Sequence, residues 1–119
     1  MGARAQVKIK TSPKKSVYLY THWGAESLEQ DVARALAKRW RWSDSGYLAR
    51  IIFEEMVGDK KGTETGFGID TEQHGDIEKL IKINTEKETI KSIDIWRRTE
   101  VSYTFEEFIE RFNVKDGNI

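Results

Sequence analysis

Hydrophobic and polar residues alternate near the start of the chain, and this period of two predicts a pair of strands. Residues 5–10 and 17–23 follow the pattern on either side of a turn-forming segment. Successive side chains of a strand point to opposite faces. We therefore expect His22 to share one face of the second strand with Tyr18 and Tyr20.

Two later segments have apolar residues every three or four positions, which predicts amphipathic helices. The first covers residues 28–40, places Trp40 on its apolar stripe, and begins with a capping box at Ser27. The second runs through residues 47–56 and closes at Gly58.

The remainder of the chain is again mostly alternating and predicts four further strands and a short helix. The strands are expected at residues 66–70, 80–84, 89–96 and 101–105. A capping box formed by Thr104 and Glu107 starts the last helix. The predicted order is β-β-α-α-β-β-β-β-α. It indicates an α+β fold, with a mainly antiparallel sheet of about five or six short strands, two main helices on one face and a short C-terminal helix.

The composition is that of one folded domain. The chain has 119 residues, of which 38% are hydrophobic and 34% charged. We expect a single domain over residues 1–119, with frayed ends at 1–4 and 113–119. There is no cysteine, which excludes disulfides and thiolate ligands. No apolar run approaches the roughly 20 residues of a membrane span, so a cytoplasmic protein is expected.

Charge is distributed unevenly although the formal net charge is zero. Residues 1–53 contain ten Lys and Arg against four Asp and Glu, and the rest of the chain balances this excess. A basic half can bind polyanions, or it can dock against the acidic half of the same molecule. The pattern leaves both interpretations open.

Several sequence blocks occur together in a recognisable order. They are 18-YLYTHWG-24, 47-YLARIIFEEM-56, 64-ETGFGI-69, a GD-x-E segment and a closing YTFEEFI. In this order they resemble a family of small uncharacterised proteins encoded by phages and prophages. The resemblance implies a viral or mobile-element setting and no particular chemistry. The chain departs from the family's usual THWGG by having Ala25 after Gly24.

His22 is the residue most suited to acid–base chemistry, because an imidazole titrates near neutral pH. If Glu64 or Asp70 orients its ring, the protein is a small hydrolase or a nucleotide-acting enzyme. In the structural alternative, His22 packs with Trp23 at the mouth of the sheet. With two histidines and no metal-binding spacing, neither a metal nor a cofactor is expected.

The glycines of residues 62–68 lack a phosphate-binding motif, since neither a P-loop nor a dinucleotide fingerprint is present. Gly66 and Gly68 are instead expected to allow a turn or bulge. They would also let the side chain of Trp23 or Tyr20 lie over the backbone.

A cluster of cations and aromatics at 38-KRWRW-42 suggests nucleic-acid binding, because phosphates attract cations and bases stack on aromatic rings. The candidate residues are Lys38, Arg39, Arg41, Lys14 and Lys15. Lys8 and Lys10 would extend the same surface. As an alternative, Trp40 belongs to the core and the lysines protect an edge hairpin.

Exposed aromatic side chains also anchor protein interfaces. The candidate binding residues are Thr21, His22, Trp23, Trp42 and Trp96. The leading hypothesis from the sequence is an accessory protein of a phage or mobile element. It would bind a host or phage protein or a second copy of itself.

Overall fold

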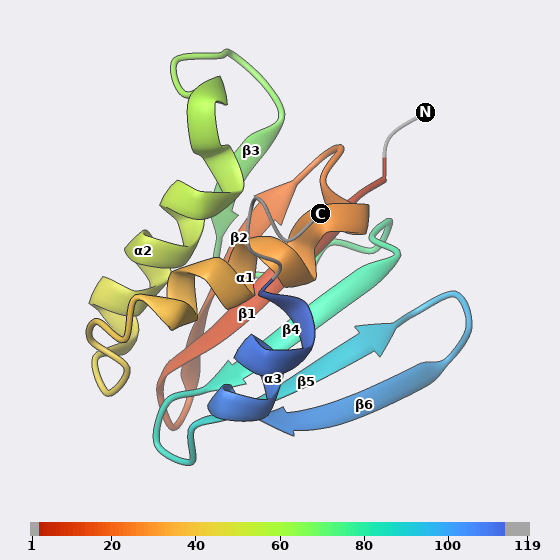
Figure 1. Cartoon of the computed structure of the whole chain (residues 1–119). Helices are drawn as coiled ribbons and strands as arrows, with labels where there is room; N and C mark the ends of the chain where they lie inside the picture. Colours follow the sequence, from red (N-terminus) through yellow and green to blue (C-terminus); the bar gives the residue numbers. More distant parts are fainter. Residues whose placement is uncertain (1–2, 114–119) are drawn as a thin grey trace, which may run out of the picture.

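The structure is a computed structural model that describes residues 3–113, and it contains one six-stranded sheet with three α-helices on one face (Figure 1). The strands are β1 (Ala5–Ser12), β2 (Lys15–Thr21), β3 (Phe67–Asp70), β4 (Lys79–Asn84), β5 (Thr89–Asp94) and β6 (Thr99–Thr104). The helices are α1 (Leu28–Ala37), α2 (Ser45–Val57) and α3 (Phe105–Phe112), with short 3-10 turns at Ala25–Ser27 and Gly58–Lys60. The predicted α+β class and element order are confirmed.

The order of strands across the sheet is β3-β2-β1-β4-β5-β6. All neighbours are antiparallel except the central pair, β1 and β4, in which Val7 lies opposite Ile81 in parallel register. A hairpin and a three-stranded meander therefore meet along the middle of the sheet. The segment between β3 and β4 has to cross β2 and β1 to make this connection.

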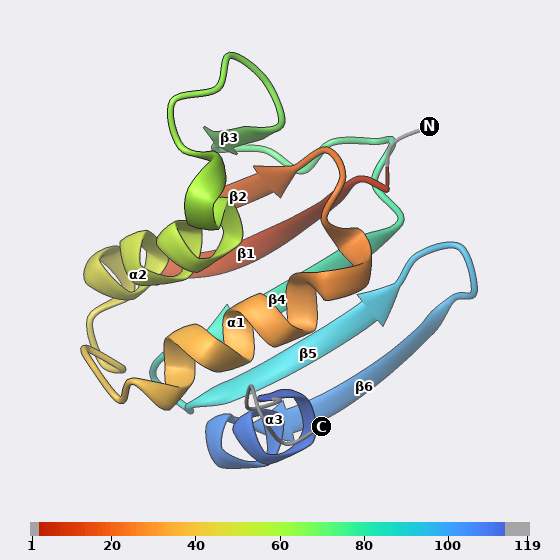
Figure 2. The ribbon, with the colours of Figure 1, turned by 45° about the horizontal axis from the view of Figure 1, so that its top comes forward.

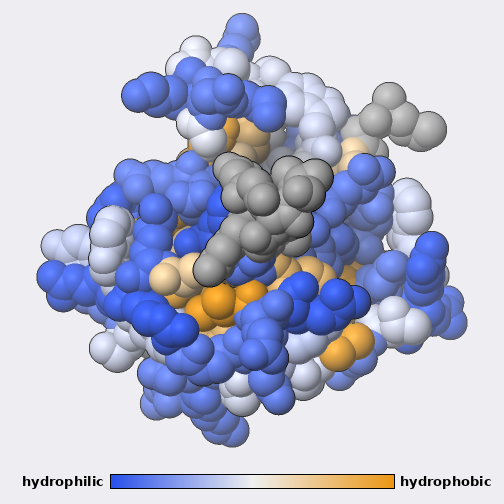
Figure 3. All heavy atoms as spheres, viewed as in Figure 1, coloured by the Kyte–Doolittle hydropathy of each residue, from blue (hydrophilic) through white to orange (hydrophobic). Residues whose placement is uncertain are grey.

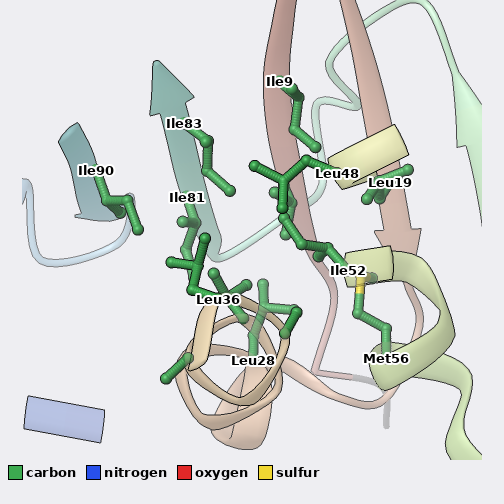
Figure 4. Packing of buried hydrophobic residues seen from close by; sticks show 14 of the residues in the cluster. Ile9, Leu19, Leu28, Leu36, Leu48, Ile52, Met56, Ile81, Ile83 and Ile90 are labelled. Atoms are coloured by element: carbon green, nitrogen blue, oxygen red, sulfur yellow. The ribbon is translucent and has the colours of Figure 1, made fainter. Parts of the chain in front are cut away.

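The core lies between the sheet and its helices, as the inward-pointing side chains of Figure 4 show. Ile9 and Ile81 from the sheet meet Leu28 and Leu36 of α1 and Leu48 of α2, and each is at most 1% exposed. Full burial of such a side chain contributes about 1.5–3 kcal/mol relative to exposure. The apolar residues of the period-two segments and those of the helical segments therefore pack against each other in one core layer.

Helix α1 is shorter than the sequence predicted and begins differently. Ser27 forms no side-chain cap, because it belongs to the 3-10 turn that precedes the helix. At the other end Arg39 has a left-handed backbone (φ 60°), and its N–H donates to the carbonyl of Leu36. Trp40 is consequently turned out of the helix and is 59% exposed, so its expected place on the apolar stripe is wrong.

The other two helices have the caps that the sequence predicted at Gly58 and at Thr104. Asp44 caps α2 by accepting the backbone N–H of Tyr47 at 3.2 Å, and the helix ends at Gly58. Before α3 the side chain of Thr104 accepts the N–H of Glu107, and the carboxylate of Glu107 accepts the N–H of Thr104 in return. The predicted capping box at α3 is therefore confirmed.

Fraying at residues 1–4 and 113–119 stays a prediction, but residues 3 and 4 do contact the rest of the molecule. The carbonyl of Ala3 accepts the N–H of Ala25, and the side chain of Arg4 contacts His22 and Asp76. Residues 1–2 and 114–119 lie outside the described residues. Between residues 3 and 113, no helix has the length and hydrophobicity that a membrane crossing requires.

The two faces of the sheet differ in their covering. Figure 2 shows the helices gathered on one side, and Figure 3 shows that this side is mostly hydrophilic with a central hydrophobic area. We call the opposite side the open face. The crossing segment after β3 covers one end of it, where Ile77 is buried against Tyr18 and Leu80. The other end carries charged side chains.

Candidate functional site

A groove of about 290 Å³ lies on the uncovered end of the open face, and five lysines line it. They are Lys8 and Lys10 of β1, Lys82 of β4, Lys87 of the β4–β5 turn and Lys91 of β5. The neutral polar residues Asn84, Thr89 and Ser102, together with Ile83 and Ile90, complete the lining. We call this set of five lysines the lysine groove.

Alternation along the strands places these lysines on one face. Val7 and Ile9 point into the core, so Lys8 between them points to the open face. The pairing of the strands then puts Lys8 beside Lys82, and Lys82 beside Lys91. Neighbouring strands are about 4.8 Å apart, so three cations stand side by side across the middle of the sheet.

Carboxylates neutralise little of this charge. Among the described residues only Lys91 of the groove forms an ion pair, with Glu100 at 3.4 Å. The ammonium of Lys8 lies 5.8 Å from the centre of the Tyr18 ring, which is a cation–π contact. Like charges that face each other across a strand pair destabilise a sheet. The row therefore has an electrostatic cost that a bound polyanion would remove.

The covered end of the open face holds a second group of polar side chains, which we call the histidine cluster: Arg4, Tyr20, His22, Asp70 and His74. The Nδ1 atom of His22 accepts from Arg4 Nε at 3.3 Å and lies 3.2 Å from the Tyr20 hydroxyl. The ring of His74 packs against Tyr20 at 4.7 Å between centroids, and its Nε2 is 3.0 Å from Asp70. Both histidines of the chain thus meet around one tyrosine.

The backbone beneath the histidine cluster is held by hydrogen bonds to the buried side chain of Gln6 and to the backbone of Gly66. Gln6 is fully buried, and its amide accepts the N–H of His74 at 2.9 Å and donates to the carbonyl of Glu72. The backbone N–H of His22 donates to the carbonyl of Gly66 at 2.8 Å. These contacts fix His22, which directly follows β2, and His74 of the crossing segment in one arrangement.

Trp23 covers the backbone at Gly66, as the glycine pattern predicted. A Cβ at Gly66 would lie 2.4 Å from Trp23 Cζ3, so the indole occupies the space of a side chain. The edge of the His22 ring also contacts Trp23, at 5.0 Å between centroids. The blocks around residues 18–24 and 64–69 therefore meet at the histidine cluster.

Asp70 has a different partner from the one that the sequence suggested. Its carboxylate hydrogen bonds to His74 and to the backbone N–H of Thr71, and these bonds lower its pKa below the ordinary value of 3.8. In the part of the chain that the structure describes, neither Glu64 nor another carboxylate hydrogen bonds to His22. Among the described residues there is thus no direct hydrogen bond by which Asp70 or Glu64 would orient His22.

The basic segment 38–42 is largely engaged within the molecule. Lys38 forms an ion pair with Glu55 at 3.4 Å. Arg39 makes two hydrogen bonds to Glu106, at 2.5 and 2.8 Å. Arg41 lies over the ring of Tyr47 at 4.5 Å. Two of the three cations therefore have a carboxylate partner, which weakens this segment as a phosphate-binding surface.

The remaining candidate residues have mixed positions. Thr21 is 2% exposed and accepts the N–H of Gly24, so it offers no binding surface. Trp42 packs against Phe105 and donates to the carbonyl of Leu36, which makes it a structural residue. Lys14 and Lys15 lie exposed at the β1–β2 turn. Trp23 and Trp96 are exposed as expected, at 54% and 72%.

The sequence did not single out several residues of these sites. Lys82 lies between core isoleucines and Lys91 follows one, so the sequence indicated which face of its strand each lysine occupies. The sequence did not indicate the β1–β4 pairing that joins them to Lys8. Arg4 and His74 had no local signal. Over residues 3–113, no group of three or more His, Asp or Glu is arranged to hold a metal ion.

Comparison with protein-family models, with curated proteins and with solved structures finds no match to this chain. The geometry of the lysine groove and the histidine cluster is accordingly the basis of any functional assignment.

Proposed function

We propose that the protein binds single-stranded nucleic acid in the lysine groove. The observation that carries this proposal is the row formed by Lys8, Lys82 and Lys91 on three adjacent strands. A neutral ligand would leave the repulsion within this row unrelieved, whereas a phosphodiester backbone supplies anionic groups along its length. The proposal keeps the nucleic-acid alternative but moves its site from residues 38–42 to the open face.

The shape of the groove favours a single strand over a duplex. It lies on the face of the sheet opposite the three α-helices, so none of these helices can enter a major groove from this face. Single strands are bound by cationic tracks together with aromatic rings on which bases stack. Tyr20 is partly exposed in the next row of the open face, and Trp23 is exposed beside His22. We expect these two rings to supply aromatic surface at that end of the lysine groove.

The test is the salt dependence of binding, measured by fluorescence anisotropy with labelled 20-nucleotide poly-U and poly-dT. Each phosphate contact contributes about −0.7 to the slope of log K against log salt for single strands. Lys8→Ala with Lys82→Ala should therefore make the slope less negative by about 1.4 and weaken binding at low salt. The matched control is Arg39→Ala with Arg41→Ala, which removes the same number of positive charges. It should leave the salt slope and the affinity at low salt near their wild-type values.

Two outcomes would contradict the proposal. One is that the wild-type protein fails to bind either oligonucleotide at low salt. The other is that the control pair weakens binding as much as the groove pair, since binding would then follow net charge or the 38–42 segment.

A second candidate function is protein binding in a phage or mobile-element setting, and the exposure of Trp96 favours it. This tryptophan follows β5, is 72% exposed, and is the kind of side chain that anchors an interface. If the partner is a second copy, light scattering should give a mass that rises with protein concentration, and Trp96→Ala should return it to the monomer value. A monomer mass at all concentrations would contradict self-association.

A further inference from the structure

The two histidines of the cluster each have one ring nitrogen occupied and the other free. A guanidinium can only donate, so the contact from Arg4 places the lone pair of neutral His22 on Nδ1 and its proton on Nε2. Asp70 can only accept, so His74 carries its proton on Nε2 and its lone pair on Nδ1. Within residues 3–113, Nε2 of His22 and Nδ1 of His74 have no hydrogen-bond partner.

The two histidine rings lie around the same tyrosine, and both remain accessible. Both rings are partly exposed, and their centroids lie 6.4 Å and 4.7 Å from that of Tyr20. The buried amide of Gln6 fixes the loop of His74, and Gly66 fixes the backbone of His22. Preorganisation of this kind is what proton transfer at a reacting group requires.

The cluster also adjoins the lysine groove on the same face. Gln6 precedes Lys8 by two positions on β1, and Tyr20 follows Tyr18 by two positions on β2. The Tyr18 ring is the one that Lys8 overlies. A strand bound to the groove therefore has Tyr20 of the histidine cluster in the next row of side chains, and Arg4 and His22 lie two positions further along the two strands.

We infer that the histidine cluster cleaves RNA by transfer of a phosphodiester to the adjacent ribose 2′-hydroxyl. His74 Nδ1 takes the proton of the 2′-hydroxyl while its oxygen forms a bond to phosphorus. The bond from phosphorus to the 5′-oxygen breaks, and that oxygen takes a proton from Nε2 of protonated His22. The products are a 2′,3′-cyclic phosphate and a 5′-hydroxyl, and the reaction consumes neither water nor a co-reactant.

The other members of the cluster have distinct parts in this reaction. Arg4 stabilises the negative charge that develops on the non-bridging oxygens of the phosphate. The hydroxyl of Tyr20 can accept as well as donate, so it can follow the change in protonation of His22. Asp70 is a positioning residue, because it fixes the tautomer of His74 and does not touch the substrate.

The inference rests on the proposed function only for the delivery of long RNA, and two substrates separate the two ideas. The first is a labelled 20-nucleotide poly-U strand, and the second is the dinucleotide UpA at millimolar concentration, which is too short to span the groove. Cleavage is followed by chromatography in the presence of EDTA, and mass spectrometry identifies the cyclic phosphate. A poly-U strand with 2′-deoxyribose throughout is the matched control and should stay intact.

His22→Ala and His74→Ala should each lower the cleavage rate at least 100-fold on both substrates, as expected for loss of a general acid or base. His22→Gln and His74→Gln keep a hydrogen-bonding side chain and should lose activity equally while retaining the wild-type circular dichroism. Asp70→Asn should lower kcat on UpA and leave KM unchanged. Lys8→Ala with Lys82→Ala should slow cleavage of the 20-nucleotide strand but not of UpA.

The inference is overturned if the wild-type protein forms no cyclic phosphate from either substrate, or if all histidine variants keep the wild-type rate. Salt-dependent binding of the long strand without cleavage would overturn this inference and leave the proposed function standing. Cleavage of UpA without binding of the long strand would support this inference and overturn the proposed function.

Discussion

The contact between Gly66 and Trp23 gives a prediction that the structure makes quantitative. Gly66 has a positive φ of 106°, and a Cβ built there would lie 2.4 Å from Cζ3 of Trp23. Gly66→Ala should therefore incur two separate penalties. A side chain at this φ costs about 1–3 kcal/mol, and overpacking against a fixed ring costs typically about 1–3 kcal/mol more.

A matched glycine separates the two penalties. Gly62 has a similar positive φ of 84°, but apart from its own neighbours in the chain no atom of the described residues lies within 4 Å of a Cβ there. Gly62→Ala should show the backbone penalty alone, whereas Gly66→Ala should lower the free energy of unfolding by a further 1–3 kcal/mol or so. The assay is urea denaturation followed by circular dichroism, with the midpoint and slope fitted for each variant.

The double variant tests the cause of the difference. Trp23→Ala alone should cost about 1–2 kcal/mol, less than a buried tryptophan, because the side chain is 54% exposed. Once the ring is removed, Gly66→Ala should cost no more than Gly62→Ala does. If the costs of Gly66→Ala and Trp23→Ala are simply additive, or if the two glycine variants are equally stable, the steric reasoning is refuted.

Two further predictions concern buried charges. Burial raises the pKa of Asp31 from 3.8 to about 6 although Arg34 opposes the shift, so the folded state binds this proton more tightly than the unfolded state. The stability of the wild type relative to Asp31→Asn should therefore fall as pH rises from about 4 to about 6, by at most roughly 3 kcal/mol, and stay level above that. A difference that is constant or rises with pH in guanidinium titrations would contradict this. The ion pair of Lys79 with Glu29 is 2.7 Å long and mostly buried, and Lys79 also donates to the carbonyl of Ala25. Glu29→Gln should thus lower the free energy of unfolding by about 3 kcal/mol, because it leaves the buried Lys79 without its charge partner. The double variant Glu29→Leu with Lys79→Met should lower it less, as thermal unfolding can measure. A larger loss in the double variant would contradict the reasoning.

The fold was largely readable because local patterns determine most of it. Period-two segments became strands, and the caps at Thr104 and Gly58 became helix ends. The prediction that Trp40 lies on the apolar stripe of the first helix was wrong for a specific reason. The periodicity continued past Ala37, but Arg39 adopts a left-handed backbone conformation that no local pattern indicated. The parallel pairing of β1 with β4 was also not predictable, because it depends on how a hairpin and a meander dock.

The candidate sites were less predictable than the fold for the same reason. His22 was singled out from its place at a strand end, but its neighbours Arg4 and His74 come from distant segments. The cations of residues 38–42 attracted attention because they are adjacent in sequence. Those of the groove are scattered along the chain, and only the register of Lys8 with Lys82 brings them together.

The parallel seam between β1 and β4 also bears on how the protein folds. The hairpin β1–β2 and the meander β4–β5–β6 are each closed by short turns, so they can form early, whereas residues such as Val7 and Ile81 meet only after a long loop closes. The seam should therefore be the slow step, and substitutions there should change the folding rate more than those in either hairpin. During synthesis on the ribosome, the β1 edge of the first hairpin therefore stays unpaired until β4 has emerged.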